Sequence, residues 1–233
     1  MMEYKLEVGV LRKTLLWIII VLLLLNIAVL YSKLFLGHGR LFGLVWLFNF
    51  NEEKNIPALF ATFLILINSL LFYLLYKEGV AQPKNARWRI LSYVFVFLAL
   101  DELLSFHEEL IVPLREFFDA SGLLYFTWVI PYVIIVAALS IYMIPLFIKM
   151  DKKYLAMYLV SGMLFISGAV IVELFEGRHF ERFGDDVWFY VYVTFEELLE
   201  ITGMTLCMFT SIHYLHTKCE SIGFFSIKVV RRI

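Results

Sequence analysis

Long apolar runs separated by short polar stretches make up most of this chain of 233 residues. A helix that crosses a bilayer needs about 20 apolar residues. The segments that reach this length are 15–36, 56–76, 89–110, 123–148, 154–177 and 187–215. Runs this dense are not strands of an open sheet, because the unpaired edge groups would lie in hydrocarbon. The pattern predicts an all-α polytopic membrane helix bundle with six transmembrane helices, forming a single membrane domain over residues 1–233.

The composition supports a membrane protein. Hydrophobic residues make up 62% of the chain, whereas a soluble domain is roughly 45–50% apolar. The net charge of -1 gives no indication of nucleic-acid binding, and two cysteines are too few for a disulfide framework. We therefore expect the lipid bilayer as the main partner, no nucleic acid, and a membrane-protein partner or a homo-oligomer as the remaining options.

The distribution of Lys and Arg predicts the orientation. With six spans, fourteen of these residues fall on the side of the two termini and six on the other side. Cytoplasmic loops of membrane proteins carry an excess of Lys and Arg. We therefore expect both termini in the cytoplasm and a multi-pass protein of the cell membrane.

The first outer loop is unusually apolar. Residues 41–50 read Leu-Phe-Gly-Leu-Val-Trp-Leu-Phe-Asn-Phe, which is too apolar for a solvated loop and too short to span. The segment is predicted to be interfacial or re-entrant. It either lies flat at the headgroups or covers the acidic residues described next.

Carboxylates occur inside or at the rims of the apolar runs, whose interiors contain no Lys or Arg. A bare charge at the centre of a bilayer costs about 2.5–3.5 kcal/mol. Bound protons, a bound cation or water in a cavity must therefore offset these charges. The residues are Asp101, Glu102, Glu108, Glu109, Glu173, Glu176, Glu196, Glu197 and Glu200.

Helical spacing places these acids on defined faces, at about 100° per residue. In the last span Glu196 and Glu200 form one stripe with Gly203 and Cys207. In the fifth span Glu173 and Glu176 share a face with Gly162 and Ala169, where small residues indicate close helix contact. In the third span Asp101, Ser105 and Glu108 share a face, whereas His107 points away from it.

This pattern predicts a cation site. Carboxylate oxygens suit Mg²⁺, Ca²⁺ or Mn²⁺, and one added imidazole would also permit iron or zinc. The candidate ligands to a divalent metal are Asp101, Glu102, His107, Glu108, Glu173, Glu176, Glu196, Glu197 and Glu200. Bound protons, or protonated acids bonded between helices, are the alternatives. A di-metal carboxylate oxidase is disfavoured, because the spans contain no Glu-x-x-His motif.

Three stretches carry a resemblance to known sequences: Leu-Asp-Glu-Leu-Leu-Ser-Phe-His-Glu at 100–108, Glu-Glu-Leu-Leu-Glu-Ile-Thr-Gly at 196–203, and Asn-Ile-Pro-Ala at 55–58. With these motifs the chain resembles a family of uncharacterised prokaryotic six-helix membrane proteins. The resemblance covers most of the chain and supports the motif residues as important. It implies no activity.

Three hypotheses for the function follow. The first is a membrane protein whose outward-facing carboxylate cluster binds protons or a divalent cation, with transport coupled to that binding. The second is a metal-dependent membrane enzyme that acts on a lipid or another apolar substrate, with a carboxylate as general base. The third is a non-catalytic subunit or assembly factor of a larger membrane complex.

Overall fold

A computed structural model describes residues 7–79 and 85–218 of the chain. Within these ranges the regular structure is helical, without a strand. Of the cations counted for the orientation, Lys5, Lys84, Lys228, Arg231 and Arg232 lie outside the described residues. The all-α prediction is confirmed for the described part of the chain.

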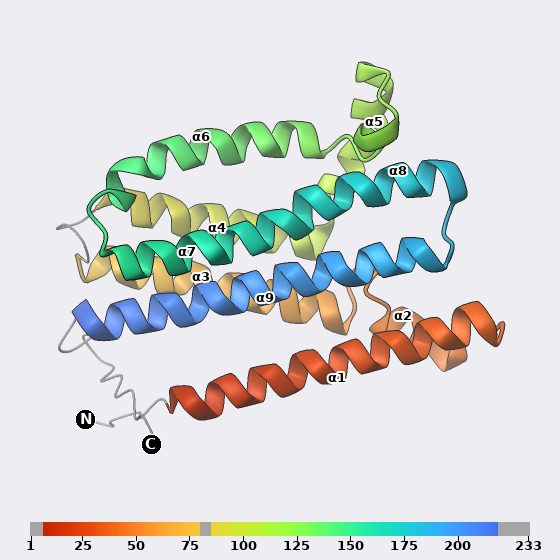
Figure 1. The fold of residues 1–233 in the computed structure, drawn as a ribbon, viewed down its shortest axis with the longest axis horizontal. Coiled ribbons are helices and arrows are strands. Elements are labelled where there is room, and N and C mark those ends of the chain that lie inside the picture. Colours follow the sequence, from red (N-terminus) through yellow and green to blue (C-terminus); the bar gives the residue numbers. More distant parts are fainter. Residues whose placement is uncertain (1–6, 80–84, 219–233) are drawn as a thin grey trace.

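Several long helices run side by side along the bundle (Figure 1). The helices that are long and apolar enough to cross a membrane are α1 (Val8–Phe35), α3 (Ile56–Lys77), α6 (Val129–Phe147), the continuous helix Lys152–Phe183, and α9 (Val187–Lys218). A bent pair, α4 (Ala86–Leu104) with α5 (Phe106–Phe118), counts as a further span if it is taken as one unit. The start of α1 and the end of α9 lie at the same end of the bundle (Figure 1). This architecture indicates a multi-pass membrane protein.

The third predicted span, 89–110, is not one continuous helix. Helix α4 ends at Leu104, Ser105 adopts a left-handed conformation (φ 56°, ψ 41°), and α5 leaves at 81°. The carboxylate of Asp101 accepts the backbone N–H of His107 at 3.0 Å. Because the first N–H groups of a helix lack partners within it, this bond stabilises the start of α5 and fixes the bend.

Other predicted boundaries also shift. The fourth predicted span, 123–148, begins as a helix only at Val129, after a 3-10 turn over Gly122–Leu124. Pro131 therefore lies in the first turn, where its missing N–H costs little. The fifth predicted span extends through α7 (Lys152–Ile166), a π-helical segment, η3 (Ser167–Val172), and α8 (Glu173–Phe183).

The apolar loop segment at 41–50 does not span. It forms a 3-10 turn (η1, Leu41–Gly43) and a short helix (α2, Leu44–Phe48), beside the end of α1 (Figure 1). Val45 is buried, whereas Phe42 and Trp46 are exposed. Exposed aromatic side chains at the end of a membrane bundle are typical of the interfacial region.

Two glycines allow α9 to approach the continuous helix α7–α8. A Cβ added at Gly203 would lie 2.8 Å from the backbone oxygen of Ser161 and from the backbone nitrogen of Phe165. A Cβ at Gly168 would lie 2.7 Å from the backbone oxygen of Glu196. The predicted contact through Gly162 is wrong, because a Cβ there would meet nothing within 4 Å. Small residues at an interface let helix backbones approach closely in membranes.

Buried amides also hold the bundle together. Asn68, on α3, donates to the backbone oxygen of Met204, on α9, at 2.9 Å. Asn26, on α1, donates to Thr194 Oγ1 at 3.0 Å and accepts the backbone N–H of Phe50 at 3.0 Å. Buried polar groups need such partners in an apolar environment. Both asparagines therefore connect helices.

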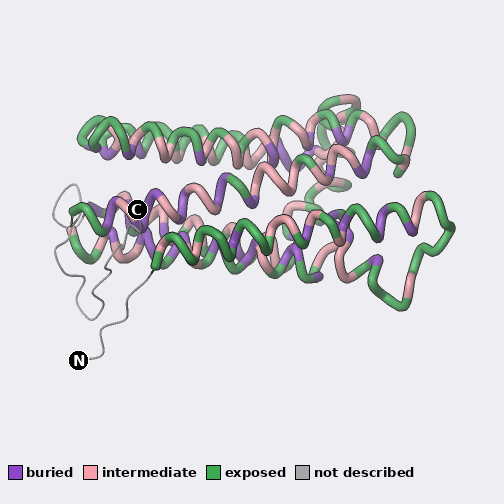
Figure 2. The backbone as a smooth tube through the Cα atoms, turned by 60° about the horizontal axis from the view of Figure 1, so that its bottom comes forward, coloured by how far each residue is buried: buried purple, intermediate pink, exposed green. Residues whose placement is uncertain are grey.

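Helix α6 is buried only near its two ends. Its buried positions are Val129 at its start and Met143 and Leu146 near its end, and residues 130–142 contain none. In Figure 2 buried positions alternate with exposed ones along the long helices. The middle of α6 therefore borders a cavity, which is described below.

The glycine contact provides a first testable prediction. Gly203→Ala would place a methyl group against backbone atoms that cannot rotate away, so we expect a destabilisation of about 1–3 kcal/mol. Thermal unfolding in detergent measures this change.

Gly162→Ala is the matched control, because it adds the same methyl group on the same pair of neighbouring helices but into open space. A transition temperature for Gly203→Ala equal to that of Gly162→Ala would contradict the close contact.

Candidate functional site

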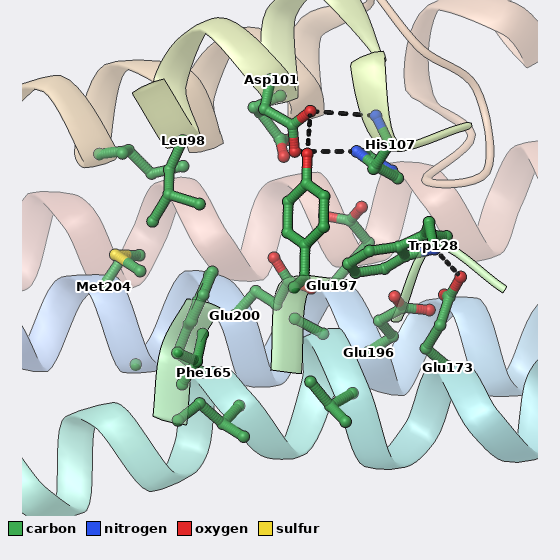
Figure 3. Close-up of a pocket in the computed structure, with 18 of the residues that line it drawn as sticks. Leu98, Asp101, His107, Trp128, Phe165, Glu173, Glu196, Glu197, Glu200 and Met204 are labelled. Carbon is green, nitrogen blue, oxygen red and sulfur yellow. Dashed lines mark hydrogen bonds and ion pairs between the residues drawn. The ribbon is translucent and has the colours of Figure 1, made fainter. Parts of the chain in front are cut away.

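A cavity of about 750 Å³ lies among α4, α6, the continuous helix α7–α8 and α9. One end is lined by carboxylates and the rest mainly by apolar and aromatic side chains. Figure 3 shows the acidic end, where side chains from these helices point toward one another. The cavity therefore combines a polar end with an apolar arm.

The tightest group of carboxylates is Glu173, Glu176 and Glu196. One oxygen of each lies within 4.8 Å of the others. Glu173 and Glu176 are 8% and 5% exposed. The Oε2 atom of Glu176 is buried and has no hydrogen-bond partner. We refer to these three residues as the glutamate triad.

The π-helical segment η3 sets the direction of two triad members. Gly168 packs against α9, and further along the same helix Glu173 and Glu176 lie beside Glu196 of α9. The step from 168 to 173 is five residues, as in a π turn. Glu196 comes from α9, beside the same glycine. The close helix contact and the π turn together form the triad.

A second group of acids lies next to the triad. Glu102, Glu197 and Glu200 line the cavity and interact electrostatically with one another. Glu53, from the loop before α3, also lines the cavity. Its Oε2 is buried without a hydrogen-bond partner. Burial raises the pKa of Glu53, and the charge of Glu108 adds to this rise.

The third element is a hydrogen-bonded unit around Asp101. Its Oδ2 faces Nδ1 of His107 at 3.1 Å, and its Oδ1 accepts the hydroxyl of Tyr132 at 2.9 Å (Figure 3). A carboxylate on one ring nitrogen fixes the orientation of a histidine. The bend at Ser105 makes this pair, because it turns His107 back toward Asp101.

Trp128 connects the triad to the histidine. Its indole Nε1 donates to Oε1 of Glu173 at 2.7 Å. Its ring lies 4.8 Å from the imidazole of His107 and 4.9 Å from the ring of Tyr132, centroid to centroid. The acidic end is therefore one connected arrangement.

The structure brings most of the predicted acids to one cavity. The predicted residues that line it are Asp101, Glu102, His107, Glu108, Glu173, Glu176, Glu196, Glu197 and Glu200. Glu109 is exposed on α5 and does not line it. The expectation that His107 points away from Asp101 is wrong, because the helix on which it was projected breaks at Ser105. Glu108 likewise leaves the face of Asp101 and lies exposed on α5.

Sequence analysis missed Glu53, Trp128 and Tyr132 as residues of the site. Tyr132 and Trp128 read as ordinary aromatic residues of an apolar span, and Glu53 as a loop residue. One signal was available for Trp128, since a buried indole N–H needs an acceptor and acids were the abundant acceptors nearby.

Comparison with known proteins gives one match. The model of a family described as a domain of unknown function (DUF8692) matches residues 15–214. The chain belongs to this family. The matched range includes all three motifs that carried the resemblance to an uncharacterised family, which is thereby confirmed. Searches of curated proteins and of solved structures find no match.

The triad fits a hard divalent cation by its chemistry and spacing. Oxygens bound to one Ca²⁺ lie about 2.3–2.6 Å from the ion. Two of them are therefore at most about 5 Å apart, and those of the triad lie within 4.8 Å. The unpartnered oxygen of Glu176 is the atom that most needs such a partner.

The Asp101 unit provides a second prediction. Asp101→Ala would leave the N–H of His107 and the hydroxyl of Tyr132 without their acceptor, and each unsatisfied buried group costs about 1–3 kcal/mol. We expect faster amide hydrogen exchange over the first turn of α5, measured by mass spectrometry.

Asp101→Asn is the conservative variant, because it keeps one side-chain oxygen as an acceptor. We expect it to exchange at a rate between wild type and Asp101→Ala. Unchanged exchange in Asp101→Ala would show that this carboxylate does not hold the start of α5.

Proposed function

We propose that this protein is a membrane-embedded enzyme that depends on a divalent cation held by the glutamate triad and acts on an apolar or amphipathic substrate. The observation that carries the proposal is a group of three carboxylates, two buried and one half-buried, within 4.8 Å of one another at the wall of a cavity. Intramembrane ionisable residues are functional by default, since their burial is costly.

A cation accounts for the triad better than shared protons alone. The carboxyl of Glu196 lies within hydrogen-bonding reach of Glu176 and Glu173, so shared protons could satisfy part of the triad, but Oε2 of Glu176 is buried and receives no donor from the rest of the described protein. Trp128 donates to only one of the triad oxygens, Oε1 of Glu173. A divalent cation would satisfy the remaining oxygens and offset their mutual repulsion.

The residues around the triad supply acid–base chemistry. A divalent cation bound there would act as a Lewis acid and would lower the pKa of a bound water. His107 has its Nδ1 held by Asp101, so that Nε2 is the ring nitrogen that would exchange a proton with substrate or water. Tyr132 and Trp128 hold Asp101 and Glu173 in place. This combination suits the hydrolysis of a polar bond next to an apolar group.

The shape of the cavity favours catalysis over coupled transport. A transport path needs polar groups along its length, whereas here the carboxylates occupy one end. Beyond Glu200 the wall of α9 continues with Gly203 and Met204, and α4 contributes Phe95 and Leu98. At the far end Trp88 lies against the rings of Phe72 and Tyr158. The apolar arm suits a substrate that itself is apolar.

The metal content tests the proposal. We expect protein purified without chelator to contain a divalent metal near one per chain, measured by elemental mass spectrometry. Glu176→Gln keeps the size of the side chain but removes a charged ligand, so the metal affinity should fall by at least about tenfold.

Glu109→Gln is the matched control, because Glu109 is an exposed acid outside the cavity. It should retain the metal affinity of the wild type. Absence of metal after titration with Mg²⁺, Ca²⁺, Mn²⁺, Zn²⁺ and Fe²⁺ would overturn the proposal and leave protonated acids as the explanation of the cluster.

A further inference from the structure

Between its two ends, α6 contacts the rest of the protein through Tyr132, which bonds to Asp101, and through Leu139, which packs against the hydrophobic core, while its neighbouring side chains on this face line the cavity. The residues of α6 that line the cavity recur at the helical period, and none between 130 and 142 is buried. They are Tyr132, Ile135, Val136, Leu139, Ser140, Met143 and Phe147. The part of this apolar face that borders the cavity instead of protein must be covered by another apolar material, since an empty gap loses dispersion contacts.

The apolar arm of the cavity extends along several turns of α4. On α4 its apolar lining runs from Trp88 to Leu98, ten residues apart. At 1.5 Å per residue this is about 15 Å, which matches the roughly 15 Å of one leaflet of the hydrocarbon core. The arm has the length and lining expected for a hydrocarbon chain.

The cavity opens sideways into the surroundings of the bundle. Phe97, Ile135 and Ile166 line the cavity, and they are also 46%, 55% and 37% exposed. These residues belong to α4, α6 and α7, which border the cavity. In a bilayer the molecules that meet this opening are lipid chains.

Charge restricts the polar group of the occupant. Among the described residues that line the cavity, Lys33 is the only lysine or arginine, and it contacts Tyr190 and lies away from the glutamate triad. Acidic residues far outnumber Lys33 in the lining of the cavity. Carboxyl oxygens accept hydrogen bonds from an ammonium group, whereas an anionic headgroup would find Lys33 as its only lysine or arginine among the described lining residues.

We propose that the cavity binds an amine-bearing membrane lipid, which enters sideways beside α6, places one chain in the apolar arm and its headgroup at the glutamate triad. The proposal rests on the proposed function for the role of the triad and names the substrate class of that site. The binding of the chain depends on the apolar arm alone.

Gly162 provides a variant that fills the arm without a clash. It lines the cavity, and a Cβ there meets nothing within 4 Å. Gly162→Phe would therefore occupy the space of the lipid chain. Met163→Phe is the matched control, because Met163 is the next residue of the same helix, is 60% exposed and does not line the cavity.

The experiment is photo-cross-linking in vesicles of phosphatidylethanolamine and phosphatidylglycerol that contain a phosphatidylethanolamine with a diazirine in one chain. Peptide mass spectrometry compares the label on Leu139 and Met143, which line the cavity, with the label on Ile134 and Ile141, which do not. In wild type we expect label on both faces. In Gly162→Phe the inner label should fall several-fold with the outer label unchanged, and Met163→Phe should match the wild type.

A second probe tests the headgroup. The same diazirine chain on phosphatidylglycerol should label the inner face several-fold less than the phosphatidylethanolamine probe. Inner labelling that is at background, or that Gly162→Phe leaves unchanged, would overturn the binding of a lipid chain. Equal inner labelling by the two probes would overturn the selection of an amine headgroup.

Metal analysis of the same samples separates the two proposals. Lipid labelling of the inner face in a protein that binds no metal would overturn the proposed function and keep the lipid site. Metal binding at the triad without inner-face labelling would overturn the lipid site and keep the cation site.

Discussion

The close approach of α9 to the continuous helix α7–α8 is the contact on which the acidic site depends. Gly203 and Gly168 make it feasible, since a side chain at either would meet backbone atoms at under 3 Å. A wider separation of these helices would move Glu196 away from Glu173 and Glu176 and admit lipid between them. The proximity of Glu196 to Glu173 and Glu176 therefore depends on a helix contact made through two glycines.

The bend at Ser105 contributes the other half of the site. A straight helix would carry His107 away from Asp101, but the left-handed residue turns α5 by 81° and brings the imidazole to the carboxylate. Trp128 then joins this pair to the triad through its bond to Glu173. Breaks in membrane helices occur where they line a cavity, and here the freed N–H of His107 is satisfied by Asp101.

Most residues of the candidate site were predictable from the sequence because charge in an apolar run is a strong signal. Composition and period placed acids of three helices at a similar depth, but the convergence of these helix faces was not predictable, because the order of the helices in the bundle is not encoded in their period. The contributions of Glu53, Trp128 and Tyr132 were not predictable either, because these residues are common at helix ends and interfaces and their role arises only from what packs beside them.

The sequence by itself determined the helical class, the positions of the apolar segments and the identity of the acidic residues, since hydrophobic length and the cost of buried charge are local properties. It also placed the chain in a family of unknown function. Only the tertiary structure decided that α4 ends at Leu104 and that Gly168 makes a helix contact while Gly162 faces a cavity. It also decided that the middle of α6 borders this cavity. These features depend on the order and rotation of helices in the bundle, which the period of one segment does not encode.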